Sequence, residues 1–250
     1  EKIPSGAEAM IKAGVLENPK VEKIFGLHVS PELEAGSFGF HTGNFMASSD
    51  EIYLTVTGKG GHAAMVPPAQ NALLIAAEIL LALKELNNPT APVVLSFGKI
   101  EGKGATNVVP DTVEIAGTLR CFDEEKRFNE LHPKIKAVCQ EVANKHGANC
   151  DVNILQGYPV LVNNEPLTAA VKKLAQEFAG NENILEIPTR MGSEDFAYYT
   201  HQVPACFYRL GVGNKAKGIT SGIHTPTFNI DEDALKMSIG LMAWIALKSI

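Results

Sequence analysis

Three side chains of the kinds that bind metal ions stand far apart in this sequence: Glu1, His28 and His224. His28 lies near the end of a mostly apolar segment, residues 21–29, and His224 lies in a loop, residues 221–228, that precedes an amphipathic stretch. Neutral imidazoles and carboxylates are ligands that Zn²⁺ and similar divalent ions take in proteins. These residue types fit a metal site, but their wide spacing leaves open that His28 is a hydrogen-bonded core histidine.

A further histidine, His62, ends the glycine-rich run Gly58-Lys-Gly-Gly-His62, which follows a strand predicted over residues 51–57. Glycine has no Cβ, so such a run can turn sharply or approach another backbone closely. An imidazole held at a strand end can donate a hydrogen bond or exchange a proton near neutral pH. The alternative is that His62 only caps or packs the loop.

Hydrophobic periodicity gives the middle of the chain the order β-α-β-β-α-β. The predicted strands cover residues 51–57, 93–100, 112–120 and 150–155, and the predicted helices cover 71–86 and 124–146. This order is typical of the split βαβ arrangement, a four-stranded sheet with two helices on one face. We therefore expect residues 49–157 to form an inserted domain.

The flanking parts, residues 1–48 and 158–250, alternate helix and strand, which is typical of an α/β domain. Helices are predicted over residues 7–16, 165–179 and 232–247, and strands over 21–29, 36–41 and 205–210. Strand 21–29 is apolar enough to be buried on both faces, and Asp231 is placed to cap the last helix.

Composition limits the classes of partner. The net charge of −6 argues against nucleic acid and anionic membranes, and no apolar run approaches the length of a membrane span. Four scattered cysteines without a C-x-x-C pair favour a reducing compartment, so we expect a cytoplasmic protein. Because the sequence starts at Glu1 rather than at methionine, we expect it to be part of a longer polypeptide.

Six short motifs are spread over nearly the whole sequence. In chain order they are Phe25-Gly-Leu-His-Val29, Gly58-Lys-Gly-Gly-His-Ala-Ala64, Asn107-Val-Val-Pro-Asp111, Gly117-Thr-Leu-Arg120, Met191-Gly-Ser-Glu-Asp-Phe196 and His224-Thr-Pro-Thr-Phe228. In these motifs and their order the sequence resembles the M20 metallopeptidase family. The likeness is greatest to its amidohydrolase branch, which includes hippurate hydrolases, N-acyl-amino-acid amidohydrolases and auxin-conjugate hydrolases.

The resemblance implies an aminopeptidase-like catalytic domain interrupted by a ferredoxin-like lid that makes a homodimer. It also implies hydrolysis of an amide bond in an N-acyl amino acid or small peptide-like conjugate. Up to two divalent ions per subunit activate a water molecule, with zinc the first expectation and manganese, cobalt and nickel the alternatives. A glutamate acts as general base and then as proton donor.

By resemblance, Glu1, His28 and His224 are metal ligands, and the glutamate base lies just before Glu1. His62 reaches from the lid to stabilise the oxyanion, often in the site of the partner subunit.

The resemblance also assigns substrate-orienting roles to Asn107 and Arg120, and it places Ser193 and Glu194 near the substrate pocket. A guanidinium suits a substrate carboxylate. The alternatives are a surface ion pair for Arg120, and a helix cap and solvated acid for Ser193 and Glu194.

The sequence departs from the family by lacking its N-terminal part, which carries further metal ligands and the base. Two other hypotheses therefore stay open. The chain could be a catalytically silent dimerisation and binding module, or it could belong to a dipeptidase of the same family. His28, where peptidase branches more often have an acid, favours the amidohydrolase branch.

Overall fold

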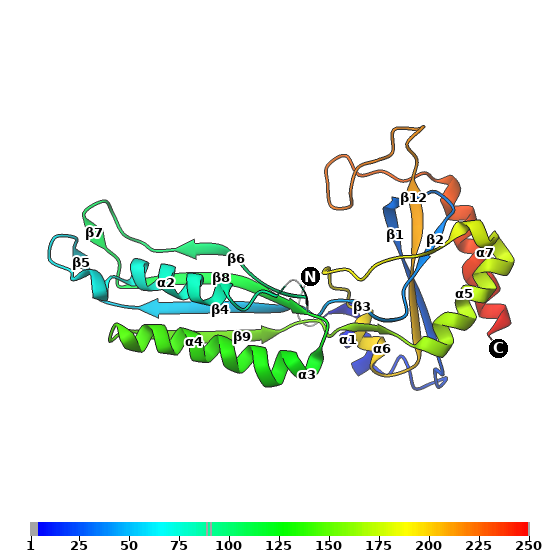
Figure 1. Ribbon diagram of the computed structural model, residues 1–250. Coiled ribbons are helices and arrows are strands. Elements are labelled where there is room, and N and C mark those ends of the chain that lie inside the picture. Colours follow the sequence, from blue (N-terminus) through cyan, green and yellow to red (C-terminus); the bar gives the residue numbers. More distant parts are fainter. Residues whose placement is uncertain (1–4, 89, 91, 250) are drawn as a thin grey trace. The chain divides into compact units, whose positions relative to one another are not determined.

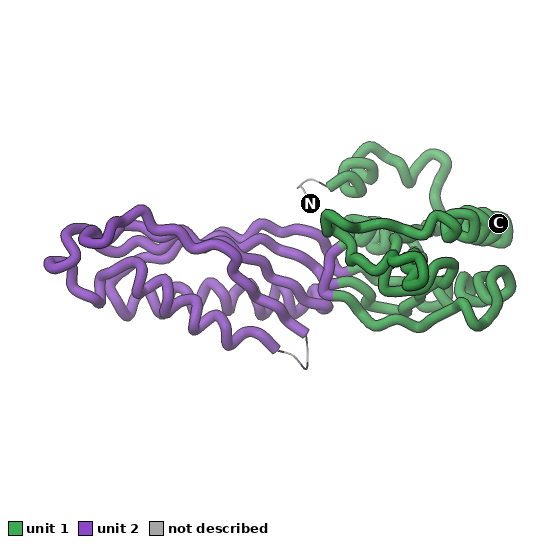
Figure 2. The backbone as a smooth tube through the Cα atoms, turned by 90° about the horizontal axis from the view of Figure 1, so that it is seen from above, with its two compact units in different colours: residues 1–46, 161–190, 194–250 green, residues 47–160, 191–193 purple. Residues whose placement is uncertain are grey.

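The computed structural model describes residues 5–88, 90 and 92–249, which fall into two compact units (Figures 1 and 2). Unit 2 consists of residues 47–160 and 191–193, and unit 1 consists of residues up to Met46 together with 161–190 and those from Glu194 onward. The long insertion of unit 2 therefore begins after Met46 and ends at Val160.

Unit 2 is built on an antiparallel sheet with the strand order β6-β8-β4-β9. Its main elements are β4 (Asp50–Thr57), α2 (Ala72–Lys84), β6 (Val93–Glu101), β8 (Thr112–Cys121), α4 (His132–Lys145) and β9 (Asn149–Gln156). Their order along the chain is the β-α-β-β-α-β order that the sequence predicts. The two helices pack against each other and share one core with the sheet, as the split βαβ arrangement requires.

The alternation of β4 explains why the sheet has one covered face. Ile52, Leu54 and Val56 are at most 1% exposed and contact the helices, whereas Tyr53 between them is 40% exposed. Successive side chains of a strand point to opposite faces, so this pattern buries one face and leaves the other in solvent.

A second, two-stranded sheet pairs β5 (Gly61–His62) with β7 (Val108–Val109) at one end of unit 2 (Figure 1). The short 3₁₀ helix η1 (Pro68–Gln70) follows β5. The sequence predicts only a turn and a loop here, because two-residue strands show no periodicity.

The single helix predicted over residues 124–146 is wrong in its first part. The structure has a short α3 (Glu124–Lys126), a π-helical turn η2 (Arg127–Leu131) and then α4. In a π turn, hydrogen bonds join residues five apart, which brings Arg127 and His132 towards one face. Both side chains donate to the carboxylate of Asp50, so the π turn gives this one acid two partners.

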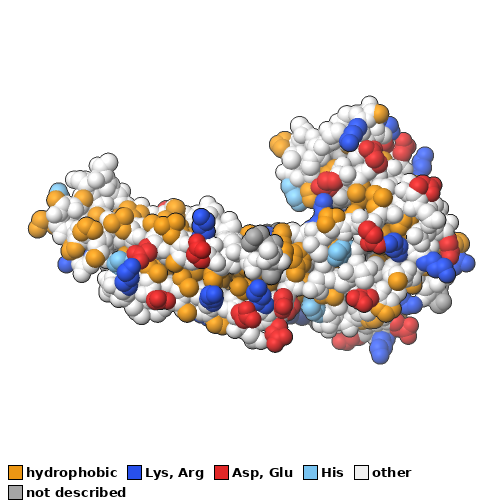
Figure 3. Space-filling model, viewed as in Figure 1, with side chains coloured by type: hydrophobic (Ala, Val, Ile, Leu, Met, Phe, Trp, Pro, Cys, Tyr) orange, Lys and Arg blue, Asp and Glu red, His pale blue; other side chains and the backbone are white. Residues whose placement is uncertain are grey.

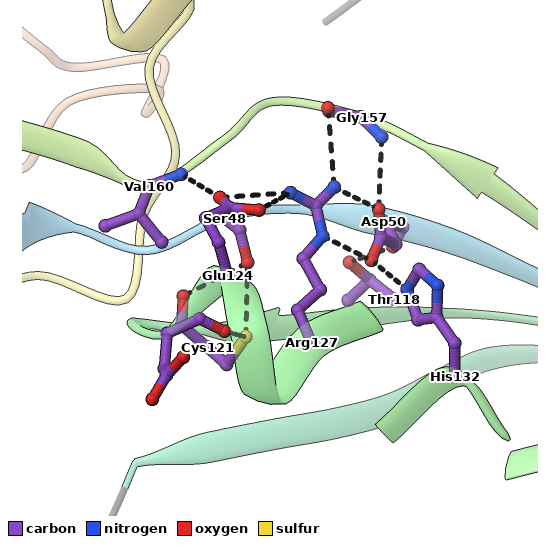
Figure 4. Close-up of polar contacts among 10 residues, drawn as sticks. Ser48, Asp50, Thr118, Cys121, Glu124, Arg127, His132, Gly157 and Val160 are labelled. Atoms are coloured by element: carbon purple, nitrogen blue, oxygen red, sulfur yellow. Dashed lines mark hydrogen bonds and ion pairs between the residues drawn. The ribbon is translucent and has the colours of Figure 1, made fainter. Parts of the chain in front are cut away.

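The resulting buried cluster is drawn in Figure 4. Arg127 Nε lies 2.9 Å from one Asp50 oxygen, and His132 Nε2 lies 2.7 Å from the same oxygen. The backbone N–H of Gly157 donates to the other Asp50 oxygen at 3.1 Å. Burial acts to raise the pKa of Asp50, but the contacts with Arg127 and His132 outweigh it and lower the pKa. Asp50 is therefore an ionised carboxylate inside the protein.

Glu124 extends the cluster to the residue where the chain leaves unit 2. Its carboxylate accepts from Arg127 Nη1 at 2.9 Å and from the backbone N–H of Val160 at 2.6 Å. The first and last strands of the unit, which begin and end beside these residues, are thus fastened to the same guanidinium.

Unit 1 contains a mixed sheet with the strand order β1-β12-β2-β11. Its strands are β1 (Ile24–Glu34), β2 (Phe38–Phe40), β11 (Ile184–Glu186) and β12 (Ala205–Gly213), its helices are α1 (Gly6–Lys12), α5 (Glu165–Ala179), α6 (Ala197–Thr200) and α7 (Asp233–Lys248), and η3 (Asn181–Asn183) is a 3₁₀ turn. Helices α5 and α7 pack with the sheet around Tyr208 and Leu210. The prediction of helix 165–179 is confirmed residue for residue.

One expectation for unit 1 is wrong. Strand β1 is an edge strand of the described sheet and is mostly half-buried, so it is β12 rather than β1 that is buried on both faces. The sequence predicts no strand over residues 43–46, which form β3 (Gly43–Met46) and pair with β10 (Leu161–Asn163). This pairing joins segments more than a hundred residues apart, so no local pattern reveals it. Asp231 does accept the backbone N–H of Asp233 at 3.3 Å, near the start of α7.

We expect Arg127→Met to lower the free energy of unfolding by about 3–5 kcal/mol, because it leaves the Asp50 charge buried without its main partner. Urea unfolding monitored by circular dichroism measures this change. Lys145→Met is the matched control, since it breaks an exposed ion pair of the same unit and is expected to cost less than about 1 kcal/mol. An equal cost for both variants would contradict the assignment.

The same cluster predicts an acid dependence. The pKa of Asp50 is lowered on folding, so its contribution is complete above the ordinary value of 3.8 and is lost as the pH falls through the lower folded value. We expect the wild type to lose stability below about pH 4, and Asp50→Asn to be less stable at neutral pH with a flatter acid limb. Urea unfolding at a series of pH values measures both curves.

Candidate functional site

A backbone carbonyl fixes the tautomer of the neutral His28 ring. Its Nδ1 lies 2.8 Å from the carbonyl oxygen of Val29, which can only accept a hydrogen bond. Nδ1 therefore carries the proton, and Nε2 keeps its lone pair. A carbonyl that orients a histidine in this way is the usual outer partner of a histidine ligand.

His224 lies in the loop between β12 and α7, and it is exposed. Its φ of 62° makes it the only non-glycine residue with a positive φ among those that the structure describes. A non-glycine residue in this region is strained, and such strain is concentrated at functional sites. His28 lies in β1, and the loop of His224 follows β12, the parallel neighbour of β1.

Asp231, at the end of that loop, is hydrogen-bonded to residues at the start of the loop. This carboxylate, 4% exposed, accepts from Asn214 Nδ2 at 2.6 Å and from Lys217 Nζ at 2.8 Å. Backbone hydrogen bonds of 2.9 and 2.8 Å between Asn214 and Ile219 close the first turn of the loop. Asp231 therefore holds the loop that carries His224 through its contacts with Asn214 and Lys217. The sequence predicted only its position near the start of the last helix.

The described residues contain no group of three or more His, Cys, Asp or Glu side chains arranged to hold a metal ion. Glu1, the third predicted ligand, lies outside the described residues. The metal site therefore stays a prediction, supported by the tautomer of His28 and the strained backbone of His224.

His62 lies in β5 of unit 2 and is exposed. Its Nδ1 accepts the backbone N–H of Ala64 at 3.3 Å, so in the neutral ring the proton is on Nε2. His62 thus presents an N–H donor to solvent, which is the form that can stabilise an oxyanion.

The glycines before His62 make the close approaches that the sequence predicts. A Cβ on Gly58 would lie 2.5 Å from the carbonyl oxygen of Gln70, and one on Gly60 would lie 2.8 Å from the backbone nitrogen of Asp111. The Asp111 carboxylate also accepts the N–H of Gly60 at 2.9 Å. Only glycine fits at these positions, and the contacts fix the direction in which His62 leaves the turn.

Asn107 lies beside His62. The Ala63 N–H donates to the Asn107 carbonyl at 2.9 Å, and His62 is paired with Val108 in the β5-β7 ladder. The predicted oxyanion donor and one predicted substrate-orienting residue are therefore brought together.

Arg120 and Ser193 form the other pair. Arg120 Nη1 donates to Ser193 Oγ at 2.9 Å within unit 2, although the residues are far apart in the sequence. Helix α6 begins after Phe196 without a side-chain cap, so Ser193 does not cap it. Both residues are only half-buried, and a guanidinium supported by a hydroxyl can receive a carboxylate.

The structure does not bring Arg120 to His62 and Asn107. Asn107 precedes the start of β8 and Arg120 is near its end, and a strand rises about 3.3 Å per residue. From Thr112 to Arg120 alone, this amounts to roughly 26 Å. Within one chain, a single small substrate cannot contact both ends of β8.

Glu194 opens the segment that returns to unit 1, and its carbonyl accepts the N–H of Ala197. The neighbouring Asp195 is a residue that sequence reasoning missed. Its carboxylate accepts the N–H of Ala7 at 3.0 Å, at the first turn of α1, where Ser5 also caps the helix. Its position inside the motif Gly192-Ser-Glu-Asp195 was the only available signal.

The described elements define an α/β protein with a second, α+β unit inserted into the first. The model of "Peptidase family M20/M25/M40" matches residues 1–248. The chain belongs to this family, and the predicted resemblance is confirmed.

Two of the curated relatives are named for the hydrolysis of amino-acid conjugates or N-acetylated amino acids. The chain is 34% identical to an IAA-amino acid hydrolase ILR1-like 2 of Arabidopsis thaliana, over 98% of this chain and 56% of that protein. It is 33% identical to the N-acetyl-L-cysteine deacetylase of Bacillus subtilis, over 94% of this chain and 55% of that protein. The chain therefore spans little more than half the length of these relatives.

A solved structure of a dinuclear metal-binding peptidase of the M20 family, the YXEP protein of Bacillus subtilis, has the same fold. It superposes with a TM-score of 0.78 at 27% identity, over 100% of this chain and 62% of that one. Among the described helices of the chain, none is both long and apolar enough to cross a membrane.

We expect Asp231→Asn to loosen the loop of His224, because the neutral amide loses the charge that holds Lys217 and offers one acceptor fewer. The amides of Asn214 and Ile219 should exchange with deuterium about tenfold faster, measured by NMR. Asp233→Asn, whose side chain is 75% exposed, is the control and should leave these rates unchanged. Equal rates in wild type and Asp231→Asn would show that Asp231 does not hold the loop.

Proposed function

We propose that this chain belongs to a metal-dependent amidohydrolase that removes the acyl group from N-acyl amino acids or small peptide-like conjugates. Membership of the M20 family supports a hydrolase, and the names of the relatives support this substrate class. The single observation within the chain that carries the proposal is His62, an exposed imidazole whose Nε2–H is available because Nδ1 is occupied.

The metal centre in this proposal takes ligands from unit 1. His28 offers the lone pair of Nε2, and His224 and Glu1 are the other proposed ligands. When bound, a divalent ion supplies a Lewis acid for the amide carbonyl and lowers the pKa of water. Zinc is the first expectation, because imidazole and carboxylate suit it, and a centre of two ions is supported by the similar YXEP peptidase, which is a dinuclear metal-binding protein.

His62 stabilises negative charge on the carbonyl oxygen as the amide is attacked. A neutral N–H donor aimed at a developing oxyanion contributes mainly in the transition state, so it acts on kcat more than on KM. Asn107, held beside His62 by the β5-β7 pair, assists in orienting the acyl part.

Arg120 and Ser193 hold the carboxylate of the amino-acid part. A guanidinium matches a carboxylate with two parallel N–H donors, and the hydroxyl of Ser193 keeps the guanidinium in place. A positive group at this position selects substrates with a free carboxylate over their amides.

The distance along β8 supports a homodimer. If one substrate contacts both His62 and Arg120, the two residues come from different subunits, because about 26 Å of strand separates them within one chain. Exposed apolar side chains on α2 and β6 offer a surface for the contact, and Figure 3 shows hydrophobic side chains along unit 2. The most exposed of them are Leu74 (54%), Leu81 (68%) and Ile100 (51%).

Release of free amino acid from N-acetyl amino acids and indole-3-acetyl amino acids tests the activity. We expect turnover that a chelator abolishes and that added Zn²⁺ or Mn²⁺ restores. His28→Ala should lower the bound metal, measured by elemental analysis, and His201→Ala is the control. Turnover that is insensitive to chelator, or full metal content in His28→Ala, would refute the metal site.

Mixing two inactive variants tests the shared site. We expect His62→Gln and Arg120→Met each to lower kcat/KM at least 100-fold. After subunit exchange, activity should return to roughly a quarter of wild type, because half of the dimers are mixed and each mixed dimer holds one intact site. No recovery after exchange, verified by mass spectrometry of mixed dimers, would place both residues in the same subunit.

A further inference from the structure

Arg209 is a charged residue in the middle of a buried strand. All residues of β12 are buried, and Arg209 is only 2% exposed. Alternation along the strand puts it on the same sheet face as Phe207, whereas Tyr208 and Leu210 point to the face covered by α5 and α7. In the parallel ladder Arg209 is the register partner of His28, so the two side chains share one face of adjacent strands.

The guanidinium of Arg209 is largely unsatisfied. Nη2 donates to the thioether sulfur of Met46 at 3.0 Å, a weak acceptor. The rings of Phe45 and Phe207 have their centroids 5.8 and 5.5 Å from the guanidinium carbon. Nε and Nη1 are buried and have no hydrogen-bond partner among the described residues.

Arg209 nevertheless stays charged. Burial and the nearby charge of Arg190 lower its pKa to about 10, against the opposing effect of Glu194 and Glu32. That value still leaves the side chain protonated at neutral pH. Glu32 is engaged elsewhere, since it accepts from Ser30 at 2.6 Å and pairs with Arg190 at 3.2 Å.

An unpaired buried charge is unfavourable for stability. Replacing buried ionic groups by well-packed apolar residues is often neutral or stabilising, whereas a charge left without its partner is costly. The surroundings of Arg209, which are Phe45, Met46 and Phe207, would accept a methionine or leucine easily. A guanidinium at this position therefore calls for a partner that these contacts do not supply.

We propose that Arg209 is a carboxylate-binding residue of unit 1, acting on the sheet face that it shares with His28. The carboxylate is that of an amino-acid ligand, to whose oxygens Arg209 donates in addition to Arg120, or that of an acidic side chain of the same polypeptide. The first source rests on the proposed function, and the second does not. In both cases Nε–H and Nη1–H gain the charge-assisted hydrogen bonds that they lack.

The test uses the complete polypeptide with Arg209→Met and Arg209→Lys, which respectively remove the charge and keep it. Lys172→Met, in a surface ion pair of the same unit, is the control. Calorimetry in the presence of chelator, which prevents turnover, gives the Kd of N-acetyl-L-alanine and of its amide. Thermal unfolding without ligand gives Tm.

If a ligand carboxylate is the partner, Arg209→Met raises the Kd of the acid at least tenfold and leaves that of the amide unchanged. If an acidic side chain is the partner, Arg209→Met lowers Tm by several degrees, and Arg209→Lys recovers at least half of the loss. The second readout needs no ligand, so it remains valid if the proposed substrate class is wrong.

The proposal is overturned if the Kd values do not change and Arg209→Met has an equal or higher Tm than wild type. It is also overturned if both variants lower Tm equally without a change in Kd, because Arg209 would then only fill space.

Discussion

The straightness of β8 constrains every interpretation of this chain. The strand is paired on both sides, with β6 and with β4, over almost its full length, so it cannot fold back on itself. Near its two ends lie the two pairs of residues that could contact a substrate, His62 with Asn107 before its start and Arg120 with Ser193 at its end. Any mechanism that uses both pairs on one small molecule therefore requires a second copy of the chain, and this follows from strand geometry alone.

Local packing decides where His62 points. Close backbone contacts at Gly58 and Gly60 and the carboxylate of Asp111 fix the turn, and the Ala64 N–H fixes the ring tautomer. The glycine run predicted the first feature, because only absent Cβ atoms permit such approaches. The tautomer could not be predicted, since it depends on a hydrogen bond that exists only once the turn has formed. The position and tautomer of His62 are thus determined mainly by residues within the β5-β7 end of unit 2.

The order of elements was predictable wherever a stripe of apolar residues is long. Helix α5 and the β-α-β-β-α-β series follow from periodicity and were confirmed. The π turn at Arg127 could not be predicted, because the contact it serves is the one between Arg127 and Asp50, which lies 77 positions away along the chain. The same holds for the link from Arg120 to Ser193, 73 positions apart. The identities of the site residues came from a resemblance, since spacing alone left His28 and His224 unconnected.

The two buried arginines, Arg127 and Arg209, differ in whether carboxylates surround them. Arg127 is surrounded by the carboxylates of Asp50 and Glu124, which raise its pKa despite burial, and it joins the two ends of unit 2. Arg209 has aromatic and thioether neighbours, and burial lowers its pKa. A paired buried charge can be explained by architecture, because its partners are part of the fold. An unpaired one in register with His28 has no such explanation within the described residues, which is the reason for proposing that Arg209 binds a carboxylate.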